Sequence, residues 1–547
     1  MAPYGWTAAV LGLAWILWIV LMSASSDSTA AMNDMEMGYM RKAIVWGLGG
    51  IGALTALVFG GHWGFKALAH SSRAESMAAM DSSVVPEQTG APTWSLELRG
   101  VGFTPGPNHQ TPVWKMIQSK HDNFASIYSQ DPTDYPDSAQ SRQRYTSTRT
   151  GSAFRYAATD SVAYWPIPTF VVEPPNVGKH EFVRAAGLIN EGRNKGSLGV
   201  TLFLWQQDAN TTHAQGMIGQ LFDLFDTNAE IPMALIAARD GDVVRWYYAE
   251  RGTPPIPDEH FVPVVEDTTA TLLVARTDRV NRYLRPFAPE YAENNQDIGT
   301  DLGKLWSFFF ESEVQARNQY EDEARAAGAE SPRDPGTMPT SYWQSVLPAL
   351  WETTDNRGPG EFKPTSWLPI RWAKHQVDEF DQAPHLGHLH RPIKVMLRDA
   401  DGKPLKPALQ TQAMLEGWQQ ALATLPEGSV PRRVFYDSHD GTALSVALNN
   451  ALHALNADGH GLELGNVDEG YDIGRRIANV GVTSPLVQIG LGAVASYHEG
   501  GASAVVYAGD DGSATIQMVR PPSAEEKAKN NPHGINHDPF MRRVRGG

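Results

Sequence analysis

Between Arg391 and Pro522 the sequence alternates short apolar runs with longer stretches whose apolar residues recur at helical spacing. Ile393 to Arg398 (IKVMLR) and Arg433 to Tyr436 (RVFY) are typical of strands. Ala408 to Leu425 and Thr442 to Leu455 are typical of helices. Strands and helices that alternate in this way predict an α/β fold, because each helix must bury its apolar face against the sheet.

The end of this stretch carries the clearest local signals. Thr483, Ser484 and Pro485 provide an N-cap and a first-turn proline for the helix LVQIGLGAVASY, which Gly500 and Gly501 end. The runs ASAVVYA and SATIQMV follow and are joined by GDDG, a composition typical of a tight hairpin. The predicted order of elements is therefore β-α-β-α-β-α-β-β.

A weaker echo of this pattern lies upstream. Val200 to Trp205 (VTLFLW) precedes the helical run AQGMIGQLFDLFD and the strand-like run that begins at Ile231. These match, in order, IKVMLR, ALQTQAMLEGWQQ and RRVFYDSHDG, and both copies end at an acidic turn that contains glycine. We therefore expect a duplicated α/β unit. Leu302 to Ala327, between the copies, predicts one long helix with a charged, amphipathic second half.

A β-α-β-α-β-α-β-β unit present twice resembles the thiolase and β-ketoacyl synthase fold, and TSPLVQIGLGAVASY is similar to the late helix of those enzymes. The resemblance implies a layered thiolase-like architecture. The acyl-forming nucleophile of that family is a cysteine, and this chain contains no cysteine. A member of this fold class with this sequence would be a non-catalytic relative.

The remaining segments set the expected domain organisation. The stretch from about 104 to 185 is rich in Pro, Asp, Ser and Tyr and predicts long irregular loops. We expect a membrane anchor with two transmembrane helices (1–70), a linker (71–92), an N-terminal α/β half (93–300), a connecting helical and loop region (301–390), a C-terminal α/β half (391–522) and a disordered tail (523–547).

The anchor is predicted from two uncharged apolar runs, Trp6 to Met22 and Ala43 to Gly61. Each run has about the 20 residues that a helix needs to cross a bilayer; the alternative for the first is a removable signal peptide. Gly47, Gly49 and Gly52 form a GxGxxG pattern, which inside an apolar run favours helix packing over dinucleotide binding. We expect an inner-membrane protein whose large domain faces the cytoplasm, with the periplasm as the alternative, because flanking basic residues are balanced.

Composition excludes several function classes. The formal net charge of -16 makes nucleic acid an unsuitable partner, since binding to phosphates needs a basic surface. The absence of cysteine excludes disulfides, thiolate metal sites and cysteine nucleophiles. The GxGxxG pattern lies in an apolar run, where it does not indicate dinucleotide binding, so no cofactor is predicted.

Three histidines, His385, His388 and His390, lie within the motif APHLGHLHRP. They could ligate a metal ion together with Asp381 or Asp399. Their spacing on a proline-flanked segment matches no tight metal motif, so the alternative is that they cap strands and bond the backbone. We predict no metal site but retain these histidines as functional candidates.

Two further polar clusters are candidates. Asp437, His439 and Asp440 in YDSHDG could belong to a catalytic triad, or could simply form an acidic turn at the end of a strand; no GxSxG elbow accompanies them. Asp472 beside Arg475 and Arg476 in GYDIGRR could bind an anion, or could fix a loop through an internal salt bridge.

Several segments together resemble a known family. They are WSLELRGVGF, the prolines of Asp131-Pro132 and Tyr135-Pro136, YWPIPTFVVEPPN, HLGHLHRP, and Glu469 to Ala504. They are similar to the adaptors that serve lipase effectors of type VI secretion systems. The resemblance covers roughly residues 94–522 and implies a non-catalytic protein that binds a phospholipase effector and loads it onto the C-terminal region of a VgrG spike.

Two other functions remain open at this stage. One is a membrane-bound acyl-group enzyme on a thiolase-like fold, with His or Asp in place of the cysteine; it requires two of the candidate histidines to converge on a Ser or Asp. The other is a structural protein of the envelope.

Overall fold

The computed structural model describes residues 95–120, 124–175, 184–206, 213–250, 252–326, 328, 336–456, 461–531 and 537–541. The chain divides into two compact units, Met1–Thr89 and Gly90–Gly547, and every described residue lies in the second. The predicted anchor, with its glycine pattern, and the predicted linker lie outside the described residues.

The prediction of an inner-membrane protein is corrected by the structure. No helix within the described residues is long and apolar enough to cross a membrane. The longest of them, α9 (Asp301–Ala326), has one buried face and carries charged residues throughout its second half.

A single mixed sheet passes through the described residues in the order β3-β2-β4-β5-β1-β6-β11-β10-β8-β9, and β7 pairs with β11 outside this path. The first half contains β1 (Ser95–Phe103), β2 (Pro166–Val172), β3 (Leu202–Trp205), β4 (Met233–Asp240) and β5 (Thr268–Ala275). The second half contains β6 (Gly387–His390), β7 (Ile393–Val395), β8 (Pro431–Tyr436), β9 (Gly470–Asp472), β10 (Ala502–Ala508) and β11 (Ala514–Arg520).

The two halves repeat one strand order and one set of strand directions. In the first half β3, β2 and β4 are parallel, and β5 runs antiparallel to both β4 and β1. In the second half β9, β8 and β10 are parallel, and β11 runs antiparallel to β10, β6 and β7. The predicted α/β class is confirmed, as is the hairpin between β10 and β11. Antiparallel pairing of β1 with β6 joins the halves.

The match between copies that the sequence pattern suggests is wrong by two strand–helix steps. By position in the sheet, β3 corresponds to β9 and not to β7, whose counterpart is β1. The helix after β3, α6 (Ala214–Thr227), accordingly corresponds to α15 (Ser484–Glu499) and not to α12 (Pro407–Leu422). Each strand–helix step of an α/β chain has similar periodicity, so only sheet neighbours reveal the correct match.

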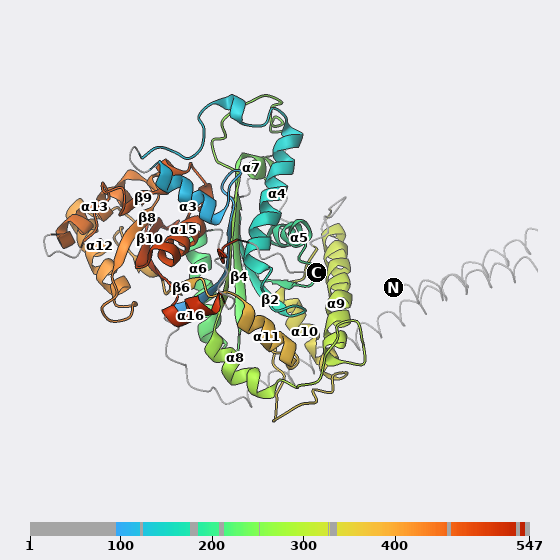
Figure 1. Cartoon of the computed structure of the whole chain (residues 1–547). Helices are drawn as coiled ribbons and strands as arrows, with labels where there is room; N and C mark the ends of the chain where they lie inside the picture. Colours follow the sequence, from blue (N-terminus) through green and yellow to red (C-terminus); the bar gives the residue numbers. More distant parts are fainter. Residues whose placement is uncertain are drawn as a thin grey trace, which may run out of the picture. The chain divides into compact units, whose positions relative to one another are not determined.

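The helices form three layers around the sheet (Figure 1). Helices α3 (Gln110–Ser119), α6 and α15 lie between the halves, in a core to which β1, β4, β8 and β10 all contribute. A second core covers the outer face of the first half, and a third covers that of the second half. The outer helices of the first half are α4 (Ala139–Ala158), α5 (Arg184–Gly196), α9, α10 (Thr340–Trp351) and α11 (Lys374–Gln382); those of the second half are α12 and α13 (Thr442–Asn456).

Four short helices complete the described structure: α7 (Asp242–Tyr247), α8 (Thr277–Tyr283), α14 (Ile473–Arg476) and α16 (Ala524–Lys529). Single 3-10 turns occur at Pro132–Asp134, Arg285–Phe287, Ser438–Asp440 and Gly481–Thr483. The long helix predicted at 302–327 is confirmed as α9.

The prediction of irregular loops between 104 and 185 misses α4, a helix of 20 residues. Its composition is polar, but Ser138 caps its first turn by accepting a hydrogen bond from the backbone N–H of Ser141. Tertiary packing then stabilises it, because a Cβ atom at Gly100 or Gly102 of β1 would lie 1.8 or 2.0 Å from carbonyl oxygens of α4. The two glycines therefore let the helix backbone lie directly against the strand.

The prediction of a disordered tail is also wrong for the described residues beyond 522. Ser523 and Glu526 form a capping box that begins α16. Asn530 is buried and bonds the backbone of His385, and Phe540 is 2% exposed against Tyr497. This polar segment folds because its few anchoring side chains fit sites on the second half of the sheet.

Candidate functional site

The three histidines of APHLGHLHRP lie on or beside β6, where the two halves of the sheet join. The Nη1 atom of buried Arg99 lies 3.0 Å from Nδ1 of His385. Nη1 also contacts Nε2 of the same ring, and because a guanidinium can only donate, the neutral His385 ring accepts at one of its two nitrogens. Burial, and then the charge of Arg99, lower the pKa of His385 to about 4.

The other two histidines are held differently. Nε2 of His388 lies 3.3 Å from Oε2 of Glu526 on α16, and this contact lowers the pKa of Glu526 well below its usual range. His390 is buried, and burial followed by the charge of Arg520 lowers its pKa to about 4. The three histidines therefore contribute to a polar cluster at the joint between the halves.

This cluster has no metal-site geometry within the described residues, where no group of three ligating side chains converges. Asp381, considered as a further ligand, pairs with Arg285 at 2.7 Å. Asp399 accepts hydrogen bonds from the backbone N–H groups of Asp401 and Lys403 in its own turn.

Asp437 and His439 come together, but not as a nucleophile and its base. The hydroxyl of Ser484 donates to Oδ2 of Asp437 at 2.6 Å, and Nδ1 of His439 lies 3.2 Å from Oδ1 of the same carboxylate. The carboxylate thus stands between serine and histidine, whereas a triad requires the histidine to bond the hydroxyl. Asp440 belongs to the adjoining 3-10 turn.

Asp472, Arg475 and Arg476 fix a loop. Asp472 caps α14 by accepting from the backbone N–H of Arg475 at 3.3 Å. Arg476 is fully buried, donates to the carbonyl of Lys120 at 3.0 Å and lies 4.5 Å from the ring centroid of Phe124. Burial lowers the pKa of Arg476. The contacts are a helix cap and a cation–π contact that hold the segment before residue 128 against the second half.

A large cleft lies elsewhere, in the first half, with a volume of about 760 Å³, comparable with pockets of about 300–1,000 Å³ that bind small molecules. Three chain segments and one helix form its walls. They are Thr104–His109 after β1, Ile127–Asp137, Glu266 just before β5, and the face of α4 that carries Ser141, Tyr145 and Arg149.

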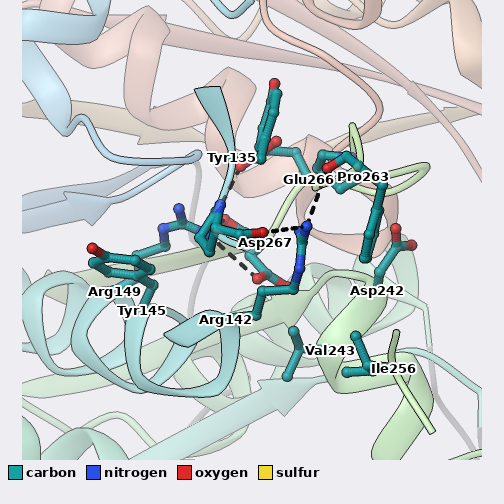
Figure 2. Close-up of a pocket in the computed structure, with 12 residues that line it drawn as sticks. Tyr135, Arg142, Tyr145, Arg149, Asp242, Val243, Ile256, Pro263, Glu266 and Asp267 are labelled. Carbon is teal, nitrogen blue, oxygen red and sulfur yellow. Dashed lines mark hydrogen bonds and ion pairs between the residues drawn. The ribbon is translucent and has the colours of Figure 1, made fainter. Parts of the chain in front are cut away.

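The base of the cleft and an adjoining recess hold a cluster of buried charges (Figure 2). Nη1 of Arg149 lies 3.4 Å from Oδ2 of Asp267 and 3.8 Å from Oε1 of Glu266. Thr146 donates to Asp267 at 2.7 Å. Arg142, seven residues before Arg149 and so on the same face of α4, lies on the other side of Asp267.

Arg142 ties two irregular segments to α4. Its Nη2 donates to the carbonyls of Pro136 at 2.6 Å and Glu259 at 3.1 Å, and its guanidinium lies 3.5 Å from the ring centroid of Phe261. These contacts fix the walls of the cleft, since both segments lack regular secondary structure of their own beyond single turns.

Glu266 differs from its neighbours. It is 3% exposed, and burial, only partly offset by Arg149, raises its pKa to about 7. Within the described residues no hydrogen-bond donor reaches its carboxyl oxygens; the ion pair with Arg149 at 3.8 Å is the closest charged contact. Burial also raises the pKa of Asp267 and of Asp242.

Three exposed apolar or aromatic side chains, here called the rim, lie on the elements that line the cleft and recess, and Tyr145 among them lines both. Tyr145 on α4 is 45% exposed, and Tyr247 on α7 is 46% exposed. Val264, between Pro263 of the recess and Glu266, is 78% exposed. Tyrosine is a residue type enriched at the centres of protein–protein interfaces.

Two family models match this chain. One is described as the N-terminal part of the type VI lipase adapter protein Tla3 and matches residues 94–259; the other is its C-terminal part and matches residues 386–521. Together they match more than half of the 547 residues.

The chain belongs to the type VI lipase adapter family.

The two ranges that the lipase adapter models match lie one in each half of the sheet, and the first leaves out β5. The first contains β1 to β4, α4 and most of the cleft, and the second contains β6 to β11. Residues 260–385, with β5 and α8 to α11, lie between them, and Glu266 is just beyond the first range.

Solved ketosynthase structures are also similar to this lipase adapter. The ketosynthase from module 6 of the bacillaene synthase of Bacillus subtilis is 8% identical, covers 79% of this chain and 71% of its own, and has a TM-score of 0.39. Ketosynthase twelve of the bacillaene synthase of Bacillus amyloliquefaciens is 9% identical, covers 78% and 73%, and has a TM-score of 0.37. Neither similarity implies an activity for this chain.

Sequence reasoning missed the cleft of this lipase adapter. None of Arg142, Tyr145, Arg149 and Glu266 was a candidate, because each is an ordinary residue in a segment expected to be a loop, a polar run or the edge of a strand. One signal was present: Tyr135-Pro136, part of the family resemblance, lines both the cleft and the recess.

Proposed function

We propose that this protein is a non-catalytic adaptor that binds a lipase effector and carries it to the VgrG spike of a type VI secretion system. The observation that carries the proposal is the match of lipase adapter models to both halves of the sheet. The name of that family refers to a lipase, and from it we infer the partner; delivery to the spike is the role that such an adaptor would serve.

The contacts of the candidate residues favour binding over catalysis. Asp437 is engaged by Ser484 and by His439, and it holds the start of α15. His385 accepts from Arg99, and His388 pairs with Glu526. These bonds give the candidates structural roles, and the chain has no cysteine to act as an acyl-forming nucleophile. They argue against the acyl-group enzyme considered from the sequence.

The proposal is tested by purifying the full chain with each lipase encoded in the same secretion gene cluster. We expect co-elution in size-exclusion chromatography, and a larger complex when the C-terminal region of the clustered VgrG is added. A lipase from an unrelated cluster is the control and should elute separately. Separate elution of the chain and its clustered lipases at micromolar concentrations would refute the proposal.

A substitution at His439 tests the adaptor proposal against the acyl-group enzyme, for which this histidine was a candidate residue. His439 is half exposed, so His439→Ala should fold. We expect this variant to bind the clustered lipase with wild-type affinity, because His439 lies in the second half, away from the cleft.

A further inference from the structure

The cleft in the first half combines two features that rarely occur together. It is large and open to partners, yet its base exposes a carboxyl group from Glu266 that is buried and lacks a hydrogen-bond donor among the described residues. A buried polar group without a partner destabilises the protein unless something supplies the missing bond. The Glu266 carboxyl faces the cleft, so a group bound there could supply that bond.

The charges around the cleft indicate which chemical group would bind there. Asp134 and Asp137 are exposed on its wall, and Glu266 lies at its base. Arg149 is the guanidinium among the described residues that line the cleft, and it is already shared between Glu266 and Asp267. Arg142 in the adjoining recess is engaged by backbone carbonyls. Three carboxyls against one shared guanidinium favour a cationic group. That group should also donate hydrogen bonds, which are stronger when the donor is charged.

The rim adds an apolar requirement. Tyr145 and Tyr247 present exposed rings, and Val264 an exposed aliphatic side chain, on the three elements that surround the base. An exposed aromatic side chain such as Tyr145 beside a buried charge is typical of an interface hot spot, in which the apolar contacts exclude water from the ion pair. Apolar residues of a partner would cover this rim.

We propose that the cleft binds a segment of the lipase partner that presents an arginine or lysine to Glu266, with apolar residues of the same segment against Tyr145, Tyr247 and Val264. This inference rests on the proposed function and assigns it a surface. The occupant is taken to be the lipase because most of the cleft lies in the range that the lipase adapter N-terminal model matches.

The first test compares binding of the purified clustered lipase to the full chain and to Glu266→Gln, by calorimetry at pH 8. Gln has the shape of Glu but no charge, and it removes a destabilising buried carboxyl, so the variant should fold. We expect at least a tenfold weaker affinity for Glu266→Gln and about a threefold to tenfold weaker affinity for Tyr145→Ala. Glu427→Gln, an exposed carboxyl on the second half, is the matched control and should bind like the wild type.

A second measurement distinguishes an ion pair from a merely structural role. An arginine or lysine requires Glu266 to be ionised, so wild-type affinity should rise from pH 6 to pH 8, and Glu266→Gln should lose this component. The groups that face Glu266 are Arg149 and Arg142 on α4, Asp242 on α7 and Asp267 beside it, with Tyr128 and Tyr135 from the Ile127–Asp137 wall. Burial raises the pKa of both aspartates as well, so the loss of the pH-dependent component in Glu266→Gln is what assigns it to Glu266.

The outcomes are separable. If the wild-type chain does not bind the lipase, the proposed function fails. If it binds and Glu266→Gln and Tyr145→Ala retain wild-type affinity, the proposed function stands and the cleft assignment is overturned. If the two variants bind the lipase normally but lose the VgrG region, the cleft serves the spike and the assignment is equally overturned. Loss of lipase affinity together with loss of its pH dependence supports it.

Discussion

The two halves of the sheet share one strand order but differ in the connection that follows the equivalent strands β4 and β10. In the second half, β10 and β11 are joined by residues 509–513, a tight turn in which Gly509 donates to the carbonyl of Ser513 at 2.8 Å. In the first half, β4 and β5 are joined by residues 241–267, which carry α7, the exposed Tyr247 and Val264, and Glu266. The proposed recognition surface thus lies in one half of the duplicated scaffold, at a connection where the other half has only a hairpin.

The difference shows that the shared scaffold and the cleft depend on different parts of the chain. The strands of both halves are nearly continuous buried segments, because helices cover both faces. The long connection lies beyond the ends of the interior strands β4 and β5, where insertions leave the core unchanged. The following predictions test whether the two halves contribute equally to stability and whether the cleft responds to pH differently from the rest of the fold.

The largest effect is expected in the outer cores. Phe154 on α4 and Trp418 on α12 occupy corresponding helices, and both are almost fully buried. Phe154→Ala and Trp418→Ala should each lower the free energy of unfolding by about 3–5 kcal/mol, through lost burial and a cavity. Urea unfolding of the full chain measures this, and we expect a single transition because β1 and β6 join the halves.

The matched control is Leu409→Ala on the exposed face of α12, which should change stability by less than about 0.5 kcal/mol. A large loss in only one of the two aromatic variants would show that the halves are not energetically equivalent.

Lowering the pH should lower the stability that the histidines beside the β1–β6 pairing contribute. His385 and His390 have pKa values lowered to about 4, by burial first and then by Arg99 and Arg520 respectively. Between pH 6.5 and pH 4 the unfolded chain takes up protons that the folded chain does not, so stability falls as the pH falls, by up to about 3 kcal/mol for each histidine. Unfolding free energies measured from pH 7 to pH 4 should show this loss.

The neutral variant His385→Gln should retain the fold and reduce that dependence on pH. An identical slope in His385→Gln and wild type would contradict the prediction.

The cleft should respond to pH in the opposite direction. The folded-state pKa of Glu266 is raised to about 7 by burial, above its value in an unfolded chain. The folded protein therefore holds a proton that the unfolded chain releases between about pH 4.5 and pH 7, and stability contributed by this group is lost as the pH rises. Glu266→Gln should be more stable than wild type at pH 8, by up to about 3 kcal/mol, and equal to it at pH 4.

Thermal or urea unfolding of both proteins at the two pH values measures this difference. If Glu266→Gln were less stable than wild type at pH 8, the Glu266 carboxylate would be stabilised by the fold itself. It would then not need a cationic group of a partner.

The smallest effect concerns the start of α15, which is held from both halves. Oδ2 of Asp240 in the first half accepts from the backbone N–H of Val482 at 2.8 Å, and Asp437 in the second half accepts from Ser484. Asp240→Ala and Asp437→Ala should each lower the free energy of unfolding by about 2 kcal/mol, because a buried donor loses its acceptor. The double variant should lose less than the sum, since both act on one turn; strict additivity would show that the two anchors are independent.

Much of the second half could be predicted from local sequence. The helices at α12, α13 and α15 follow apolar spacing, and the β10–β11 hairpin follows GDDG, because such signals depend only on neighbouring residues. The family resemblance was likewise readable from short segments. The α4 helix was missed because its polar sequence is stabilised by packing against Gly100 and Gly102, which are far away in the chain.

The sequence by itself determined the α/β class, the presence of two similar units, the absence of thiol chemistry and membership of an adaptor family. Only the tertiary structure decided which strands of the two halves correspond, where the cleft lies, and which carboxyl is buried at its base. Periodicity and turn composition are local properties, whereas the burial of Glu266 depends on α4, the segment before residue 138 and the long β4–β5 connection meeting at one place. Burial of a charge arises from contacts distant in sequence, and no pattern of neighbouring residues encodes it.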